Sequence, residues 1–195
     1  MTTALQIARS GLDALDQRMK TISNNLANVS TTGFKKDRAS FASLMYQDDR
    51  NPGAASGADT QYATGLGTGT GVRVVGTERM HSQGTLQTTD NALDLAIDGA
   101  GFFAVQLADG TVGYTRDGGF KLSANGEMVT ASGLRLAQPL TIPDGAQQIT
   151  ISPDGIVTAA VAGQAAPVEV GQLQLTRFLN PAGLMPVGDN LYRET

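Results

Sequence analysis

Apolar side chains near the N-terminus recur at alternating intervals of three and four residues. The positions are Leu5, Ala8, Leu12, Leu15, Met19, Ile22, Leu26 and Val29. This heptad spacing places one narrow apolar stripe along a helix and is typical of a helix that faces a partner helix. We therefore expect a helix over residues 4–29, about 35–40 Å long at 1.5 Å per residue. The eight positions are called the heptad seam, and the polar face opposite them carries Arg9, Asp13, Asp16, Gln17 and Lys20.

The last turns of this predicted helix are rich in asparagine. Asn24, Asn25 and Asn28 are poor helix formers, and their amides can cap carbonyl groups or bond to neighbours. Gly33 suits a left-handed exit from the helix, and Phe34 is placed to pack back onto it. A helix cap is one interpretation, but three amides exceed what a cap needs. We therefore expect a contact with another subunit through the heptad seam and these five residues.

The next segment, residues 48–71, is composed of small and polar residues. Its glycines alternate at positions 65, 67, 69 and 71, and no phosphate-loop pattern accompanies them. Such a composition cannot bury enough apolar surface to order itself. An extended, Gly/Ala-rich linker is therefore expected between the helix and the C-terminal region.

From Val72 onward the apolar pattern changes to a period of two. Short apolar runs alternate with Asp-Gly or Asn-Gly pairs at residues 98–99, 109–110, 117–118, 125–126, 144–145 and 154–155. These pairs favour two-residue hairpin turns, because both residues can adopt positive φ. The pattern predicts an α+β chain with three parts: a helical segment (1–47), the extended segment (48–71) and an all-β antiparallel domain (72–195).

Composition and charge exclude several classes of protein. The net charge of −4 argues against general nucleic-acid binding. The absence of cysteine excludes disulfides and thiolate metal sites. Arg9, Asp13 and Asp16 interrupt any signal-peptide core, and no run of about 18 apolar residues is present to span a membrane.

Candidate catalytic groups are few. Most aspartates of the β region precede a glycine, where they supply turn geometry. Asp94 and Glu169 alternate with apolar residues, which predicts that they lie on the outer face of strands. His81 is the only histidine, expected at the surface or hydrogen-bonded in a strand, and Tyr114 is the only tyrosine expected within the β body. We therefore expect no enzyme activity, no cofactor and no obligate metal.

The stretch SNNLANVSTTGFK, residues 23–35, resembles the N-terminal signature of the bacterial flagellar rod and hook proteins. Further matches lie at Phe41, Leu44, Tyr46-Gln47, Gly69–Val72, Thr77–Arg79, His81–Gly84, Ile97–Phe103, Tyr114–Gly118 and Gly188–Tyr192. Together they span nearly the whole chain. The segment between Tyr46 and Gly71 is most similar to the distal rod branch of this family.

The resemblance implies a structural subunit that polymerises helically into a rigid, hollow drive shaft, which transmits torque from motor to hook. Its implied partners are other copies, other rod and hook proteins, and the surrounding ring proteins. Its implied location is the flagellar basal body, reached through the flagellar export apparatus without a cleaved signal peptide. The resemblance also implies that residues 48–71 pack between subunits.

The sequence leaves two alternatives open. One is a hook or proximal rod subunit of the same family, and the other is a secreted β-domain glycan-binding protein or glycosidase with a helical stalk. Family members continue after the Leu191-Tyr192 region into a second heptad helix that pairs with the first. We therefore expect the first helix of this chain to be loosely held or to pack on a neighbour, and the chain alone to assemble poorly.

Overall fold

The computed structural model describes residues 2–57, 59–164 and 166–195. These residues form one α-helix, a short 3₁₀ helix and fourteen strands, all paired antiparallel, so the predicted α+β class is confirmed. The chain divides into two compact units. Unit 1 comprises residues 1–29 and 36–80, and unit 2 comprises residues 30–35 and 81–195. The boundaries expected from the sequence, after residues 47 and 71, both fall inside unit 1.

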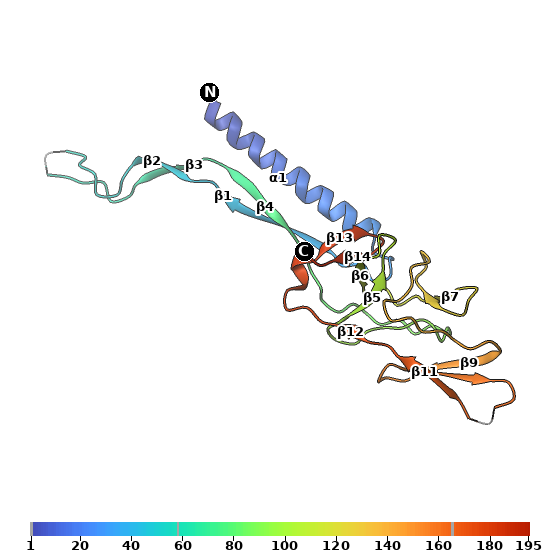
Figure 1. The fold of residues 1–195 in the computed structure, drawn as a ribbon. Helices are drawn as coiled ribbons and strands as arrows, with labels where there is room; N and C mark the ends of the chain where they lie inside the picture. Colours follow the sequence, from blue (N-terminus) through green and yellow to red (C-terminus); the bar gives the residue numbers. More distant parts are fainter. Residues whose placement is uncertain (1, 58, 165) are drawn as a thin grey trace. The chain divides into compact units, whose positions relative to one another are not determined.

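Unit 1 is built from one helix and a long two-stranded ribbon. Helix α1 (Thr2–Ala27) lies along the pair formed by β1 (Asp37–Ser43) and β4 (Val72–Arg79), here called the β1–β4 ribbon (Figure 1). An irregularity between Ser40 and Phe41 shifts the register of this pair. The bounds of α1 confirm the predicted helix of residues 4–29 to within two residues at each end.

The extended segment expected at residues 48–71 takes part in a second hairpin. Strands β2 (Tyr46–Arg50) and β3 (Leu66–Gly69) pair antiparallel and continue from the β1–β4 ribbon (Figure 1). Near the hairpin end the Arg50 guanidinium lies over the Tyr62 ring, 3.8 Å from its centroid. Backbone pairing thus orders a segment whose side chains bury little, and nearly all side chains of β2 and β3 are exposed.

Unit 2 contains the larger sheets. A five-stranded sheet has the order β12-β5-β6-β14-β13, and its members are β5 (Phe102–Gln106), β6 (Val112–Thr115), β12 (Leu175–Thr176), β13 (Met185–Gly188) and β14 (Leu191–Arg193). A three-stranded sheet has the order β11-β10-β9, with β9 (Ala146–Ile151), β10 (Ile156–Val161) and β11 (Val168–Gln172). A small pair joins β7 (Lys121–Leu122) to β8 (Met128–Val129), and the 3₁₀ helix η1 (Pro181–Gly183) precedes β13.

The core of unit 2 lies between these strands. Val105, Val157 and Ala159 are fully buried, and the rings of Phe103 and Phe120 meet edge to face with centroids 5.0 Å apart. Buried and less buried residues alternate along β10, as the period-two pattern predicts. The predicted antiparallel β region therefore owes its stability to alternating apolar residues of several short strands.

A second, aromatic cluster corrects two sequence expectations. Tyr192 lies in β14 with only 2% of its surface exposed, so Tyr114 is not the only tyrosine of the β body. His81 follows β4 rather than lying in a strand, and it is half-buried. Its ring meets the rings of Phe102 and Tyr192 edge-on, each at 5.6 Å between centroids. Packing against aromatic rings, rather than strand pairing, positions this histidine.

The turns lie near the predicted positions but are of a different type. Gly126 and Gly155 adopt positive φ, whereas the only non-glycine residues with positive φ in the described chain are Asp189 and Asn190. The pairs therefore do not form two-residue turns with two left-handed residues. Gly126 N donates to the Ser123 carbonyl at 3.0 Å, and Ser123 N donates to the Glu127 carbonyl at 2.9 Å. This is a type I turn followed by a left-handed glycine, the usual three-residue hairpin loop.

Candidate functional site

The heptad seam is exposed along the whole of α1. The exposed fraction of its large side chains ranges from 55% at Ile22 to 76% at Val29, which lies two residues beyond the helix. Ala8 is exposed as well. Complete burial of seven large apolar side chains would contribute on the order of 10 kcal/mol. An apolar stripe of this size on one surface indicates an interaction site.

A different face of α1 contacts the ribbon. This face, called the ribbon-facing stripe, consists of Ile7, Ser10, Ala14, Gln17, Thr21 and Asn25, with Asn28 just beyond the helix, and all of these are buried or half-buried. Ala14 is the most buried of them, with 8% exposed. The spacing of these residues also follows a helical period, but their side chains are mostly small or polar. Gln17, expected on the polar face, belongs to this stripe.

The remaining charged residues of the helix lie in solvent. Lys20 Nζ lies 2.7 Å from an Asp16 oxygen, and Arg9 Nε lies 3.9 Å from an Asp13 oxygen, one helical turn apart in each case. The hydrogen bond and the charge of Asp16 raise the pKa of Lys20. Exposed pairs of this kind stabilise a helix only slightly.

The N-terminal half of α1 is joined to the ribbon through Ser10. Its hydroxyl donates to the Ile7 carbonyl at 2.8 Å and accepts from the Val72 amide at 3.3 Å. Gly71, with φ of +123°, lies so close to Ser10 that a side chain there would collide with the hydroxyl. Glycine at position 71 therefore allows the close approach of helix and ribbon.

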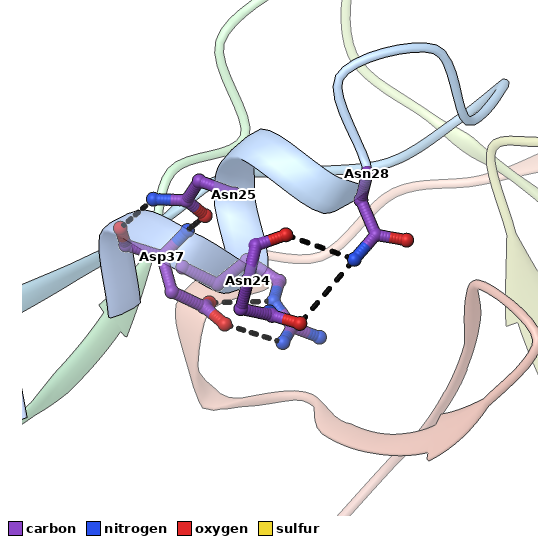
Figure 2. Close-up of polar contacts among 5 residues, drawn as sticks. Asn24, Asn25, Asn28 and Asp37 are labelled. Carbon is purple, nitrogen blue, oxygen red and sulfur yellow. Dashed lines mark hydrogen bonds and ion pairs between the residues drawn. The ribbon is translucent and has the colours of Figure 1, made fainter. Parts of the chain in front are cut away.

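The C-terminal half of α1 is joined to the ribbon through Asn25. Its Nδ2 donates to the Asp37 carbonyl at 2.8 Å, and its Oδ1 accepts from the Asp37 amide at 2.9 Å (Figure 2). The carboxylate of Asp37 in turn accepts from Arg79 Nε at 2.8 Å and from Arg79 Nη2 at 2.9 Å. We call the Asn25–Asp37 pairing the Asn25 clamp. It connects the end of α1 to the start of β1 and, through Arg79, to the end of β4.

The Ser10 contact and the Asn25 contact are about as far apart along the helix as their partners are along the ribbon. Fifteen residues separate Ser10 from Asn25, roughly 22 Å along a helix. Seven residues separate Val72 from Arg79, roughly 24 Å along a strand. The helix therefore runs parallel to β4 and antiparallel to β1, joined to the ribbon near both ends of the pair. The expectation of a helix that is loosely held or packs on a neighbour stays a prediction, and the contacts seen within unit 1 are those to the ribbon.

The structure gives the asparagines hydrogen bonds within the chain, and their expected contact with another subunit stays a prediction. The amide of Asn25 bonds to the Asp37 backbone. Asn28 Nδ2 donates to the Asn24 carbonyl at 2.9 Å and to Asn24 Oδ1 at 3.3 Å, which is a local cap (Figure 2). Asn24 is exposed. All three side-chain amides therefore take part in hydrogen bonds within unit 1.

Gly33 and Phe34 also differ from expectation. The helix ends at Ala27, so Gly33 is not its exit residue, although its φ is +73° as predicted. Both residues belong to unit 2, where the Cα of Gly33 lies so close to the Asp117 backbone that a Cβ would be 2.8 Å from Asp117 N. Glycine at position 33 is required for this packing.

Lys35 is a buried cation that sequence reasoning missed. Only 8% of it is exposed, and its Nζ donates to the Ser82 carbonyl at 2.8 Å. Burial, and then the nearby positive charge of Arg116, lower the pKa of Lys35. Burial also lowers the pKa of Arg116, which donates to Gln83 Oε1 at 3.0 Å. A lysine between two loop segments has no periodic signal that would mark it as buried.

The candidate catalytic carboxylates lie at the surface. Asp94 and Glu169 are exposed, as predicted. No group of three or more His, Asp or Glu residues in the described ranges could hold a metal ion. Within those ranges, no helix is long and apolar enough to cross a membrane.

The amino-acid sequence of this chain is similar to those of flagellar proteins. Residues 5–35 match the flagella basal body rod protein family, and residues 96–159 match the D1 domain of the flagellar hook proteins FlgE/F/G. The flagellar basal-body rod protein FlgG of Buchnera aphidicola subsp. Acyrthosiphon pisum is 51% identical over the whole chain, which covers 75% of that protein. FlgG of Borreliella burgdorferi is 43% identical, again over the whole chain and 74% of the relative. The flagellar hook protein FlgE of Helicobacter mustelae is 41% identical over 68% of this chain and 30% of its own length.

Proposed function

The chain belongs to the flagellar basal-body rod protein FlgG family, and from this premise we propose that the heptad seam is the surface through which its copies assemble. The protein is a structural subunit of the flagellar distal rod. The single observation that carries the proposal is the exposure of seven large seam side chains on a helix that is already joined to the ribbon by another face. A neighbouring subunit's helix is the natural partner of a heptad stripe.

The proposed assembly is helical. We propose that the seam of one copy meets a different surface of the next copy, which makes the contact heterologous, because a seam-to-seam pair would be isologous and would stop at two copies. Contacts of this kind that do not close into a ring generate helical filaments. Other rod and hook proteins at the ends of the filament, and ring proteins around it, are the further proposed partners.

The β2–β3 hairpin is proposed to add a second layer of contacts. A two-stranded hairpin is marginally stable alone in water, and its open edges and faces invite pairing. Nearly all its side chains are exposed, which supports a place between neighbouring subunits. Side-by-side contacts through helix and hairpin would together resist twisting, as a drive shaft requires.

The protein is proposed to act without catalysis. Asp94 and Glu169, the carboxylates that alternate with apolar residues, are exposed, whereas a glycosidase acid needs a buried setting that raises its pKa. The rod relatives match over the whole chain and the hook relative over 68% of it, which favours a rod subunit over a hook subunit.

The proposal is tested in basal bodies from a bacterium whose own rod gene is replaced by the gene for this protein. The variant Leu15→Glu with Ile22→Glu places two charges in the seam, and we expect electron microscopy to show basal bodies without a distal rod. Asp13→Lys, a change at an exposed position on another face, is expected to give the same rods as the unsubstituted chain. Normal rods from the double seam variant would contradict the proposal.

A further inference from the structure

Two stripes share helix α1, and they point in different directions. At about 100° per residue, the centre of the heptad seam lies roughly two fifths of a turn from the centre of the ribbon-facing stripe. A rotation of that size about the helix axis would turn the seam toward the ribbon and the stripe toward solvent. The amphipathic pattern of the helix thus defines an alternative orientation on the ribbon, which is not the one seen in unit 1.

Apolar burial does not favour the observed orientation. Ala14 is the only buried residue of the ribbon-facing stripe, and the others are half-buried, whereas the seam holds seven large apolar side chains in solvent. The ribbon itself still exposes apolar surface, with 37% of Phe41 and 41% of Val74 accessible. Because the hydrophobic effect is proportional to the area removed from water, it would favour a helix rotated with its seam on the ribbon.

Directional hydrogen bonds do favour the observed orientation. The Asn25 clamp requires the Asn25 side chain to face the Asp37 backbone, with its donor and its acceptor both in reach. Asp37 is fixed in turn by strand pairing and by two hydrogen bonds from Arg79, an ion pair whose side chains are only 23% and 19% exposed. A rotated helix would leave the Asp37 amide and carbonyl without these partners, which is costly for half-buried backbone groups.

We propose that Asn25 is a positioning residue that sets the rotation of α1 on the β1–β4 ribbon and thereby keeps the heptad seam presented to a neighbouring subunit. The presentation of the seam to a neighbouring subunit rests on the proposed function, whereas the rotation itself is a property of unit 1. Asparagine suits this task because its amide donates and accepts at once. Aspartate at position 25 would only accept, and its charge would lie beside the Asp37 carboxylate.

The test uses the natural absence of cysteine from the chain. Single cysteines replace Leu15 in the seam, which is 56% exposed, or Ala14 in the stripe, which is 8% exposed. The rates at which a small maleimide labels the two are compared in the purified full chain. We expect the cysteine at 15 to react at least about tenfold faster, because burial protects the one at 14.

The clamp variants are Asn25→Asp and Asn25→Ala, and Asn24→Asp is the matched control at the adjacent exposed position. With either clamp variant, we expect the two labelling rates to converge or to reverse while far-ultraviolet circular dichroism still reports the helix. The control should keep the difference. An unchanged rate ratio in both clamp variants would overturn the proposal. Loss of the helical signal in both would overturn it too, because Asn25 would then stabilise the helix rather than set its rotation.

This outcome is separable from the fate of the proposed function. Labelling is measured on the unassembled chain and is independent of rod formation. If the rates converge in Asn25→Asp but basal bodies carrying that variant still contain normal rods, the rotation stands and the assembly role of the seam fails. If Leu15→Glu with Ile22→Glu abolishes rods while the ratio of labelling rates is unchanged in the Asn25 variants, the assembly role of the seam stands. The positioning role of Asn25 then fails.

Discussion

The side chain of Asn25 and the backbone of Asp37 exchange two hydrogen bonds, of 2.8 and 2.9 Å. One amide side chain thus makes the pair of bonds that the backbone of an adjacent strand would make at this position. The start of β1 is paired by β4 on one side and by the last turns of α1 on the other. The asparagine-rich end of the helix is therefore explained in part by a contact within the chain.

Removing the Asn25 amide should weaken unit 1. We expect Asn25→Ala to lower the free energy of unfolding by about 1–3 kcal/mol, because the Asp37 amide and carbonyl lose partners in a half-buried setting. Denaturant titration followed by circular dichroism measures this change. Asn24→Ala, at an exposed position, should cost less than about 0.5 kcal/mol. Equal losses for the two variants would show that the clamp contributes nothing specific.

Two neighbouring ion pairs of the ribbon should differ in strength. The Arg79–Asp37 pair is 23% and 19% exposed, whereas the Arg38–Glu78 pair is 61% and 51% exposed. We expect Arg79→Met to destabilise unit 1 by about 2–4 kcal/mol, since it leaves a desolvated carboxylate. Arg38→Met should cost about 0–1 kcal/mol. Thermal or denaturant unfolding of the two variants would contradict this order if Arg38→Met were the more damaging.

Gly118 of unit 2 should tolerate no side chain. A Cβ at Gly118 would collide with the Leu95 carbonyl oxygen, a backbone atom that cannot move aside cheaply. We expect Gly118→Ala to destabilise the chain by about 2–4 kcal/mol. Gly84→Ala is the control, because nothing lies within 4 Å of the Cβ it would gain. Comparable melting temperatures for the two variants would contradict the packing at Gly118.

Alkaline pH should stabilise the chain through Lys35. Burial and Arg116 lower its pKa in the folded state below the ordinary value of 10.5, so the unfolded state binds the proton more tightly. The charged form is therefore a cost to folding at neutral pH. That cost is relieved as pH rises from the lowered pKa toward 10.5, and the free energy of unfolding rises across this window.

The comparison for this prediction is Lys35→Met. Relative to that variant, the wild-type chain should gain stability as pH increases through the alkaline range below 10.5. Lys36→Met, at the exposed neighbouring position, controls for the loss of one positive charge. Parallel stability curves for the wild-type and Lys35→Met chains would contradict the effect.

Patterns within one element proved readable from the sequence, whereas contacts between distant segments did not. The seam and the helix bounds follow from the local repeat of residues such as Leu12 and Met19. The Ser10–Val72 bond joins positions 62 residues apart, and small or polar side chains there carry no hydrophobic signal. The β2–β3 hairpin was missed for another reason, since backbone pairing orders it and side-chain composition does not record that pairing.

Turn type shows the same limit on a smaller scale. The positions of Gly126 and Gly155 were predictable, because glycine adopts positive φ without strain. Whether the preceding asparagine or aspartate also does so depends on the register of the strands on each side. In the described chain those residues remain at negative φ, and the loops gain one residue.

The most direct measurement of the central claim, that the seam is an assembly surface, is photo-crosslinking within isolated basal bodies. A benzophenone maleimide is attached to a single cysteine that replaces Leu15. In a matched sample it is attached to a single cysteine that replaces Asp13. We predict that irradiation joins position 15 to another rod subunit and gives a ladder of multiples on a denaturing gel, with far less product from position 13. Equal products from the two positions, or position 15 joined only to its own chain, would contradict the claim.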